Sequence, residues 1–279
     1  MIASARAELL RLSKWPVTWI VFGVWLALNV GFGYVLNYLT YRDLVDAGND
    51  RAAEALLTQL SSTGAPVTMV TGLPMFGGAL VLTLAAVATG SGYGWNTWKT
   101  VFTQGNGRQK ALAGTATALA ALLVVFVALT TVVNLGAGAV VTAVESQSFA
   151  WPDLDALAKS FGGALLIAMM WSMVGAAVGI IAKGPSVAVG LGLVWVVVVE
   201  NLLRGVAGLL GPFEAVVHVM PGTAAGSLAG ALGAPDVSQP GGAPAVNSFL
   251  TGTEAAWLLV AYIVAFAVLA GFTASRRDA

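Results

Sequence analysis

Apolar positions along this chain form six long stretches that carry no charged residue through most of their length. A helix needs about 20 mostly apolar residues to cross the hydrocarbon core of a bilayer. We therefore expect membrane-spanning helices over about 16–39, 67–90, 113–142, 160–182, 186–204 and 255–274. The fifth stretch, from Gly184 to Val199, is short unless Glu200 lies at an interface. The first runs uncharged from Trp15 to Tyr41, longer than the apolar region of about 7–15 residues in a secretory signal, so we interpret it as a retained helix.

Residues 3–14, ahead of the first predicted span, show helical spacing of apolar residues on one face. Ile2, Ala5, Leu9 and Leu12 share that face, and basic residues occupy the rest. This pattern predicts an interfacial helix in the membrane plane. The alternative is a cytoplasmic continuation of the first span. The residues assigned to the interfacial helix are Arg6, Leu9, Arg11, Lys14 and Trp15.

Two connections on the predicted outer side are long. Residues 40–66 carry four acidic residues, and we expect a solvated loop there, with a short helix from Arg51 to Leu60 as the alternative. Residues 205–253 contain Gly241-Gly242 beside two prolines, which indicates irregular chain. A weaker apolar window between Glu214 and Asp236 predicts short re-entrant helices before the last span, packed against protein.

Composition supports a membrane protein. Of the 279 residues, 58% are hydrophobic and only 9% are charged, too few to cover the surface of a water-soluble domain of this size. With six spans and the N-terminus inside, nine of the 13 basic residues and only two of the 13 acidic residues fall on the cytoplasmic side. This distribution follows the positive-inside rule and predicts a multi-pass plasma (inner) membrane protein with both termini in the cytoplasm.

Several function classes are excluded or disfavoured. The chain has no cysteine, which rules out disulfides, thiolate metal sites and thiol catalysis. It has no basic patch suited to nucleic acid. No predicted cytoplasmic segment exceeds about 25 residues, so a nucleotide-binding domain does not fit, and residues 1–279 are expected to form a single transmembrane domain. A membrane-bound enzyme is disfavoured because no region gathers paired carboxylates or a metal cluster.

The segment between the second and third predicted spans combines large aromatic residues with basic ones. Its glycines do not form a phosphate-binding loop, because Trp98 precedes Lys99 and no strand comes before. Trp95, Trp98, Val101 and Phe102 instead share one face of a predicted short helix over about 94–104, which Gly105 ends. Either lipid headgroups or a protein partner would cover that face.

These features resemble the permease subunit of ABC-2 type transporters. The resemblance rests on Glu8-Leu9-Leu10-Arg11-Leu12 through Trp15-Pro16, on Thr97-Trp98-Lys99-Thr100 through Gly105 and Arg108, and on the overall order of elements. Gly92 departs from the pattern. Many of these permeases have an acidic residue at this place, just before the tyrosine that leads into the segment between the second and third spans.

The resemblance implies a non-catalytic subunit that works as a homodimer with two separate ATPase subunits, which bind ATP and Mg, while this chain itself holds no cofactor. It also implies export of a hydrophobic or amphipathic substrate, such as a drug, an antimicrobial peptide or a lipid-like molecule. The aromatic segment becomes a coupling helix whose apolar side chains insert into a groove on the ATPase. The implied ATPase-coupling residues are Trp95, Thr97, Trp98, Lys99, Val101, Phe102 and Arg108.

Polar residues elsewhere leave alternatives open. Glu200 and Arg204, one helical turn apart with Asn201 beside them, form either a structural pair or a gate or substrate contact. His218, four residues after Glu214, is either an interface residue or a proton relay, and two ligands are too few for a zinc site. The rival function is a self-sufficient secondary transporter or channel, which typically carries ionisable residues near the bilayer midplane.

Overall fold

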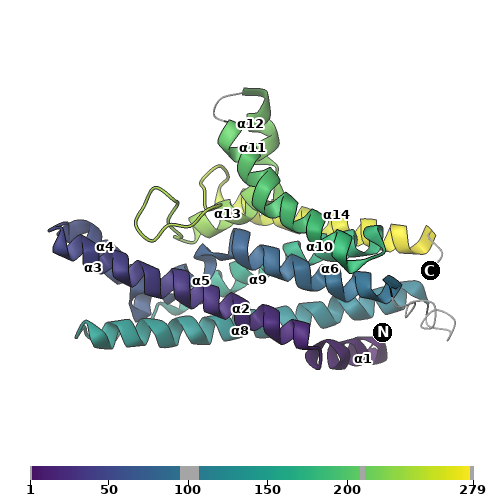
Figure 1. The fold of residues 1–279 in the computed structure, drawn as a ribbon, viewed down its shortest axis with the longest axis horizontal. Helices are drawn as coiled ribbons and strands as arrows, with labels where there is room; N and C mark the ends of the chain where they lie inside the picture. Colours follow the sequence, from purple (N-terminus) through teal and green to yellow (C-terminus); the bar gives the residue numbers. More distant parts are fainter. Residues whose placement is uncertain (1, 95–106, 208–210, 277–279) are drawn as a thin grey trace.

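The structure is a computed structural model that describes residues 2–94, 107–207 and 211–276, and within these ranges it contains helices and loops but no strand (Figure 1). Six helices among the described residues are long and apolar enough to cross a membrane: Pro16–Asp46, Leu73–Tyr93, Gln109–Val144, Leu154–Ala182, Pro185–Gly205 and Gly252–Arg276. Each coincides with one of the six predicted spans. The chain is therefore an all-helical, membrane-protein-like fold with six candidate spans, as the apolar pattern predicts.

Three of the spans are built from more than one helical segment. The first comprises α2 (Pro16–Val30), the π-helix η1 (Gly31–Leu36) and α3 (Asn37–Asp46). The second comprises the π-helix η3 (Leu73–Gly77) and α6 (Gly78–Gly94), preceded by α5 (Ala65–Thr71). The fifth comprises α10 (Pro185–Leu193), the π-helix η4 (Val194–Val199) and α11 (Glu200–Ala207). The third, fourth and sixth are α8 (Arg108–Val144), α9 (Leu154–Ala182) and α14 (Gly252–Arg276). Shorter helices are α1 (Ile2–Ser13), α4 (Asp50–Leu60), the 3-10 turn η2 (Ser62–Gly64), α12 (Gly211–His218) and α13 (Pro221–Ala231).

Local chemistry sets several helix ends. Pro16 and Pro185 begin α2 and α10, at a position where the missing N–H of proline has no cost. Asp153 caps α9 by accepting a hydrogen bond from the Ala156 N–H at 3.1 Å, which starts that helix six residues before the predicted span. Lys183 ends α9 in the left-handed conformation, with φ of 53°.

The centre of the bundle is the pair α6 and α9, whose backbones approach closely. A Cβ on Gly175 would lie 2.2 Å from the Leu82 carbonyl oxygen, and one on Gly179 would lie 2.7 Å from the Ala86 carbonyl oxygen. Glycines on α9 therefore permit this contact, as in other small-residue helix interfaces in membranes. On the outside of this pair, α14 packs against α9 and α10 packs against α6.

Two buried tryptophans tie neighbouring spans to one another. Trp25 on α2 is 1% exposed and donates its indole N–H to the Thr130 hydroxyl on α8 at 2.9 Å. Trp171 on α9 is fully buried and donates to the Pro74 carbonyl oxygen at 3.0 Å. Through this bond Trp171 joins α9 to the first turn of η3.

Both chain ends lie at one end of the bundle, where α6 ends and α8 begins, and α3 and α4 lie at the opposite end (Figure 1). At that opposite end, Glu145 accepts hydrogen bonds from the Tyr38 and Tyr41 hydroxyls at 2.5 and 3.0 Å and so joins α8 to α3. Termini on the same side agree with an even number of crossings.

The prediction of a solvated loop over residues 40–66 is wrong. The first span continues as helix to Asp46, and α4 follows after a short turn, capped by Asn49, which accepts from the Ala52 N–H at 3.4 Å. Leu56, Leu57 and Leu60 are buried on one face of α4, against Tyr34 and Val141. Of the acidic residues that suggested a loop, Asp43 and Asp46 are exposed on α3, and Asp50 and Glu54 are exposed on α4. The predicted span 67–90 is also divided, because Gly72 separates α5 from the helix that begins at Leu73.

Candidate functional site

The predicted coupling helix over 94–104 falls largely outside the described residues. Its proposed ATPase contacts Trp95, Thr97, Trp98, Lys99, Val101 and Phe102 lie there, so their prediction is untested. The structure does describe both flanks of the segment. Gly94 is the last residue of α6, and Arg108 is the first residue of α8.

Helix α1 is separate from the first span, because Trp15 takes an extended conformation between the two helices. The Thr18 hydroxyl and the Trp19 indole N–H each donate at 2.7 Å to the last carbonyl oxygens of α1, those of Leu12 and Ser13. These side chains satisfy helix carbonyls that have no partner within α1 and fix the angle between α1 and α2. Of the residues assigned to an interfacial helix, Arg6 and Lys14 are exposed, and Leu9 and Trp15 pack against the core.

Arg11 connects α1 to the bundle. Its guanidinium donates to the Glu8 carboxylate at 2.8 Å and to the Ala88 carbonyl oxygen on α6 at 3.1 Å, and it lies 5.4 Å from the centre of the Trp15 ring. Leu12, the next residue, is fully buried. The contact with Ala88 lies six residues before the end of α6, so α1 is held beside the residues that lead into the 95–106 connection.

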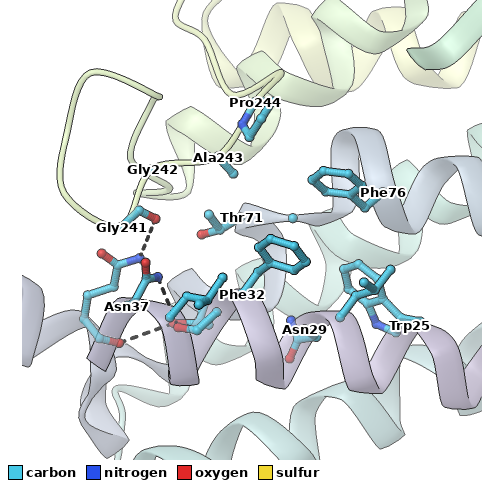
Figure 2. Close-up of a pocket in the computed structure, with 16 residues that line it drawn as sticks. Trp25, Asn29, Phe32, Asn37, Thr71, Phe76, Gly241, Gly242, Ala243 and Pro244 are labelled. Atoms are coloured by element: carbon cyan, nitrogen blue, oxygen red, sulfur yellow. Dashed lines mark hydrogen bonds between the residues drawn. The ribbon is translucent and has the colours of Figure 1, made fainter. Parts of the chain in front are cut away.

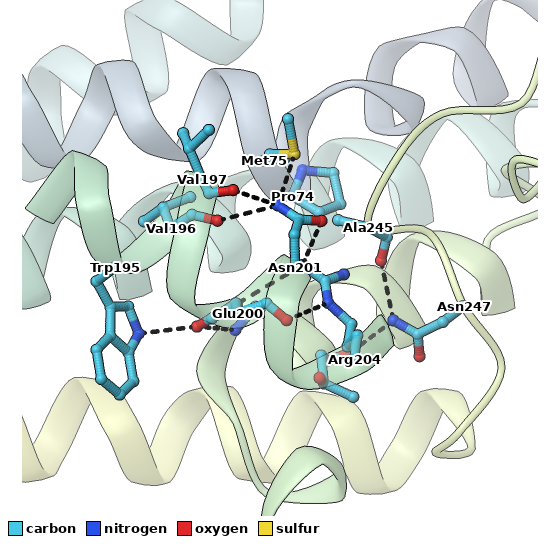
Figure 3. Close-up of polar contacts among 12 residues, drawn as sticks. Pro74, Met75, Trp195, Val196, Val197, Glu200, Asn201, Arg204, Ala245 and Asn247 are labelled. Carbon is cyan, nitrogen blue, oxygen red and sulfur yellow. Dashed lines mark hydrogen bonds and ion pairs between the residues drawn. The ribbon is translucent and has the colours of Figure 1, made fainter. Parts of the chain in front are cut away.

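Glu200 is the most deeply buried charged residue in the described part of the chain, with 0% exposure. Figure 3 shows its polar contacts. One carboxylate oxygen, Oε1, accepts from the Trp195 indole N–H at 2.9 Å and from the Gly222 backbone N–H at 3.1 Å. The other, Oε2, accepts no hydrogen bond within the described residues and lies 3.9 Å from the Arg204 guanidinium. Glu200 is thus held mainly by Trp195 and the first turn of α13, and Arg204 is a more distant partner.

Asn201 and Arg204 complete this cluster. Arg204 donates to the Glu200 carbonyl oxygen at 3.2 Å and to the Asn201 side-chain oxygen at 3.4 Å. Asn201 donates to the Val197 carbonyl oxygen at 2.9 Å. The three residues singled out in the sequence therefore lie together, with polar groups that bind mostly to one another and to backbone.

Two members of the cluster were not found from the sequence. Trp195 reaches Glu200, five residues later, across the π-helix η4, whose wider turn aligns residues at that spacing. Gly222 is required because a Cβ there would lie 1.6 Å from Glu200 Oε2. The Pro221-Gly222 pair that opens α13 is the signal that marks this helix start. Glu200 therefore holds α13 against the fifth span by accepting a hydrogen bond from a free N–H group in the first turn of that helix.

His218, at the end of α12, packs its ring against Phe249 with ring centres 5.2 Å apart. Glu214 lies one turn earlier in α12. Among the described residues, no three histidine or carboxylate side chains are grouped as a metal site would require.

Comparison with protein-family models and with curated proteins finds no match to this chain. The functional argument therefore rests on the sequence pattern and on the arrangement of the described residues.

Proposed function

We propose that this chain is the membrane-spanning permease subunit of an ATP-driven ABC-2 type transporter that exports a hydrophobic or amphipathic substrate. Two copies of the chain form the membrane pore, and two copies of a separate ATPase bind at the end that carries the termini. In this proposal the termini are cytoplasmic and the protein resides in the plasma membrane.

The observation that carries the proposal is the set of elements that gather at one end of the bundle. The termini, the end of α6 and the start of α8 lie together there, and Arg11 fixes α1 to Ala88 beside them (Figure 1). The aromatic segment 95–106 joins these two helices, so it starts and finishes at the same end as α1. A soluble ATPase bound there reaches both the interfacial helix and the coupling helix of the proposal.

Charge at this end supports the proposed orientation. Its described basic residues are Arg6, Arg11, Lys14, Arg108, Lys110, Lys183 and Arg276. The opposite end carries fewer basic residues, with Arg42 on α3 and Arg51 on α4, and these stand among the acidic residues of the same two helices and Glu145. Basic residues accumulate on the cytoplasmic side of membrane proteins, which favours a cytoplasmic location for the termini.

The length and burial of α13, which precedes the last span, support the proposal of a re-entrant segment there. Helix α13 has 11 residues, so at 1.5 Å per residue it reaches only about half of the hydrocarbon thickness of about 30 Å. It is buried from Pro221 to Ala229, and Glu200 holds its first turn. Short helices at membrane depth are tolerated when protein surrounds them, as it surrounds α13.

In the proposed mechanism, the ATPase supplies the energy and this chain converts it into a change of access. ATP closes the two ATPase subunits, and the coupling helix carries that movement into α6 and α8. The two conformations of the permease exchange because the nucleotide states of the ATPase bind them with different affinities. α1 moves together with α6, since Arg11 links the two.

Co-purification with the ATPase encoded by a neighbouring reading frame tests the proposal. We expect Trp98→Ala to abolish either capture of that ATPase or its coupled ATP hydrolysis. Trp151→Ala is the matched control, because Trp151 is 75% exposed in the connection between α8 and α9, and it should leave both unchanged. Full retention of capture and hydrolysis by the Trp98 variant would overturn the coupling assignment.

One observation favours a second candidate, a secondary transporter driven by a proton gradient. Glu200 lies within the fifth candidate span and is fully buried, and ionisable residues inside membranes often mark proton or ion pathways. Proteoliposomes that contain this chain alone distinguish the two candidates. Substrate movement that follows an imposed pH gradient without ATPase, and that disappears in Glu200→Gln, would establish the second candidate.

A further inference from the structure

We propose that helices α3 and α4 form a flap that pivots on the π-helix η1 and on Ser61, and that Glu145 latches this flap to the bundle. The flap comprises residues 37–60 and lies at the end of the bundle opposite the termini (Figure 1). The inference concerns a motion of this chain alone, so it does not depend on the ATPase partner.

The flap has an apolar cluster of its own. Within the described residues, the main core contacts the first span no farther along the chain than Leu26. A second cluster begins at Tyr34 and contains the buried face of α4, together with Tyr41 on α3 and Val141 on α8. Residues 27–33 belong to neither cluster. A group of side chains that packs within itself moves as one body, so the flap is suited to rigid rotation.

The first joint is the π-helix η1, whose wide turn interrupts the regular hydrogen bonding of the span. The Asn37 N–H bonds to the Tyr34 carbonyl oxygen, and the Asn37 side chain donates to the Gly33 carbonyl oxygen at 3.2 Å (Figure 2). A side-chain bond therefore stands where a regular helix has a backbone bond. Asn201, just after η4, likewise donates to the Val197 carbonyl oxygen at 2.9 Å. Sharp bends in helices occur at such wide turns.

The second joint is Ser61, which takes an extended conformation between α4 and the next helical turn. Both joints are fixed to α8. Beyond Ser61, the Ser62 N–H donates to the Thr142 hydroxyl at 3.1 Å. Within η1, the Tyr34 hydroxyl donates to the Asn134 carbonyl oxygen at 2.9 Å. A pair of helices that is fixed at both of its ends can rotate about the line that joins them.

Glu145, the residue that follows α8, holds the flap against that helix. Its carboxylate accepts hydrogen bonds from the Tyr38 and Tyr41 hydroxyls at 2.5 and 3.0 Å. Bonds to a charged acceptor are stronger than neutral ones. A neutral bond from Gln59 to the Gly241 carbonyl oxygen, at 3.4 Å, is a weaker contact of the flap (Figure 2). In α3 only Tyr41 is buried, so few apolar contacts of that helix oppose release once the bonds to Glu145 are broken.

Thiol labelling measures the opening, because the chain has no cysteine and each engineered one is read alone. Val141→Cys places a thiol beneath the flap, at a position only 9% exposed. In nanodiscs, we expect Glu145→Gln to raise the rate of its reaction with a water-soluble maleimide about tenfold, the equivalent of one charge-assisted hydrogen bond. If Glu145→Gln does not fold, Tyr38→Phe combined with Tyr41→Phe removes the same bonds from the flap and should raise the rate similarly.

Ala53→Cys and Ala118→Cys are the matched controls, because both positions are buried, at 4% and 1% exposure. Ala53 lies inside the flap in the first turn of α4, and Ala118 lies in the main core on α8. Both should keep their wild-type labelling rates in Glu145→Gln. An unchanged rate at Val141→Cys would refute the latch, and an equal rise at Ala53→Cys would show that the flap unfolds instead of pivoting.

Amide hydrogen exchange locates the first joint. Glu145→Gln should speed exchange in Gly31–Leu36 and leave α2 and α4 unchanged, because a pivot loosens the wide turn and keeps the helices on either side intact. Equal acceleration across α2 and η1 would overturn the assignment of η1 as the joint, since the whole span would then detach.

Discussion

Gly175→Ala tests whether the close contact between α6 and α9 organises the bundle. The added Cβ would lie 2.2 Å from the Leu82 carbonyl oxygen and 2.9 Å from the Leu82 Cα. Weak carbon–oxygen contacts in proteins occur at about 3.3–3.6 Å, so the two helices would have to separate by about 1 Å. The contacted atoms belong to backbone, so no side-chain rotation relieves the clash.

The expected cost follows from that separation. A gap of about 0.5–1 Å removes a quarter to a half of the attraction between each pair of facing atoms. Over-packing of this kind costs about 1–3 kcal/mol. We expect the upper part of this range, because α6 and α9 belong to the two most buried spans. In their most apolar stretches, 78% and 67% of the residues are buried. The higher helix propensity of alanine offsets up to about 1 kcal/mol of this cost. The free energy of unfolding should therefore fall by about 2 kcal/mol.

Thermal unfolding in detergent, followed by tryptophan fluorescence, measures the effect. Gly136→Ala on α8 is the matched control, because a Cβ at Gly136 meets nothing within 4 Å. That variant should be as stable as wild type or more stable by up to about 1 kcal/mol. If Gly175→Ala proves as stable as Gly136→Ala, the close approach of α6 and α9 is not what the structure indicates.

Three further predictions test orientation, the α1 anchor and the core. The chain has no cysteine, so in intact cells a membrane-impermeant maleimide should label Ser148→Cys and spare Lys99→Cys, and the reverse pattern would place the aromatic segment outside. Arg11→Ala should speed amide hydrogen exchange in α1 about tenfold and leave α14 unchanged, because the bond to Ala88 is lost; unaltered exchange would show that apolar packing alone holds α1. Trp25→Phe should lower stability by about 1 kcal/mol in thermal unfolding, because Thr130 loses its indole donor, and a variant with wild-type stability would contradict that role.

Hydropathy predicts the spans well because bilayer solvation depends on composition along the chain and not on tertiary contacts. The same reasoning failed for α4, where charge content suggested a loop. Leu56, Leu57 and Leu60 form one buried face only because α3 and α8 lie beside them. The π-helices also escaped prediction, since the spans containing them are apolar on all sides and show no periodicity that would reveal a wider turn.

The polar cluster was predicted in part. Glu200, Asn201 and Arg204 are close in sequence, so helical spacing alone brings them together. Gly222 reaches Glu200 from a helix 22 residues away, which sequence spacing does not show.

The π-helix η1 has a consequence for the first span as a whole. A π-helical turn holds one more residue than an α-helical turn, so removal of one residue from Gly31–Leu36 would convert the wide turn to an ordinary one and leave everything beyond it in nearly the same orientation. Tyr38 and Tyr41 would then still face Glu145, and Trp25 would stay in place on Thr130. A related sequence without η1 would therefore keep the same contacts at both ends of the span and align to this one only through a single-residue gap.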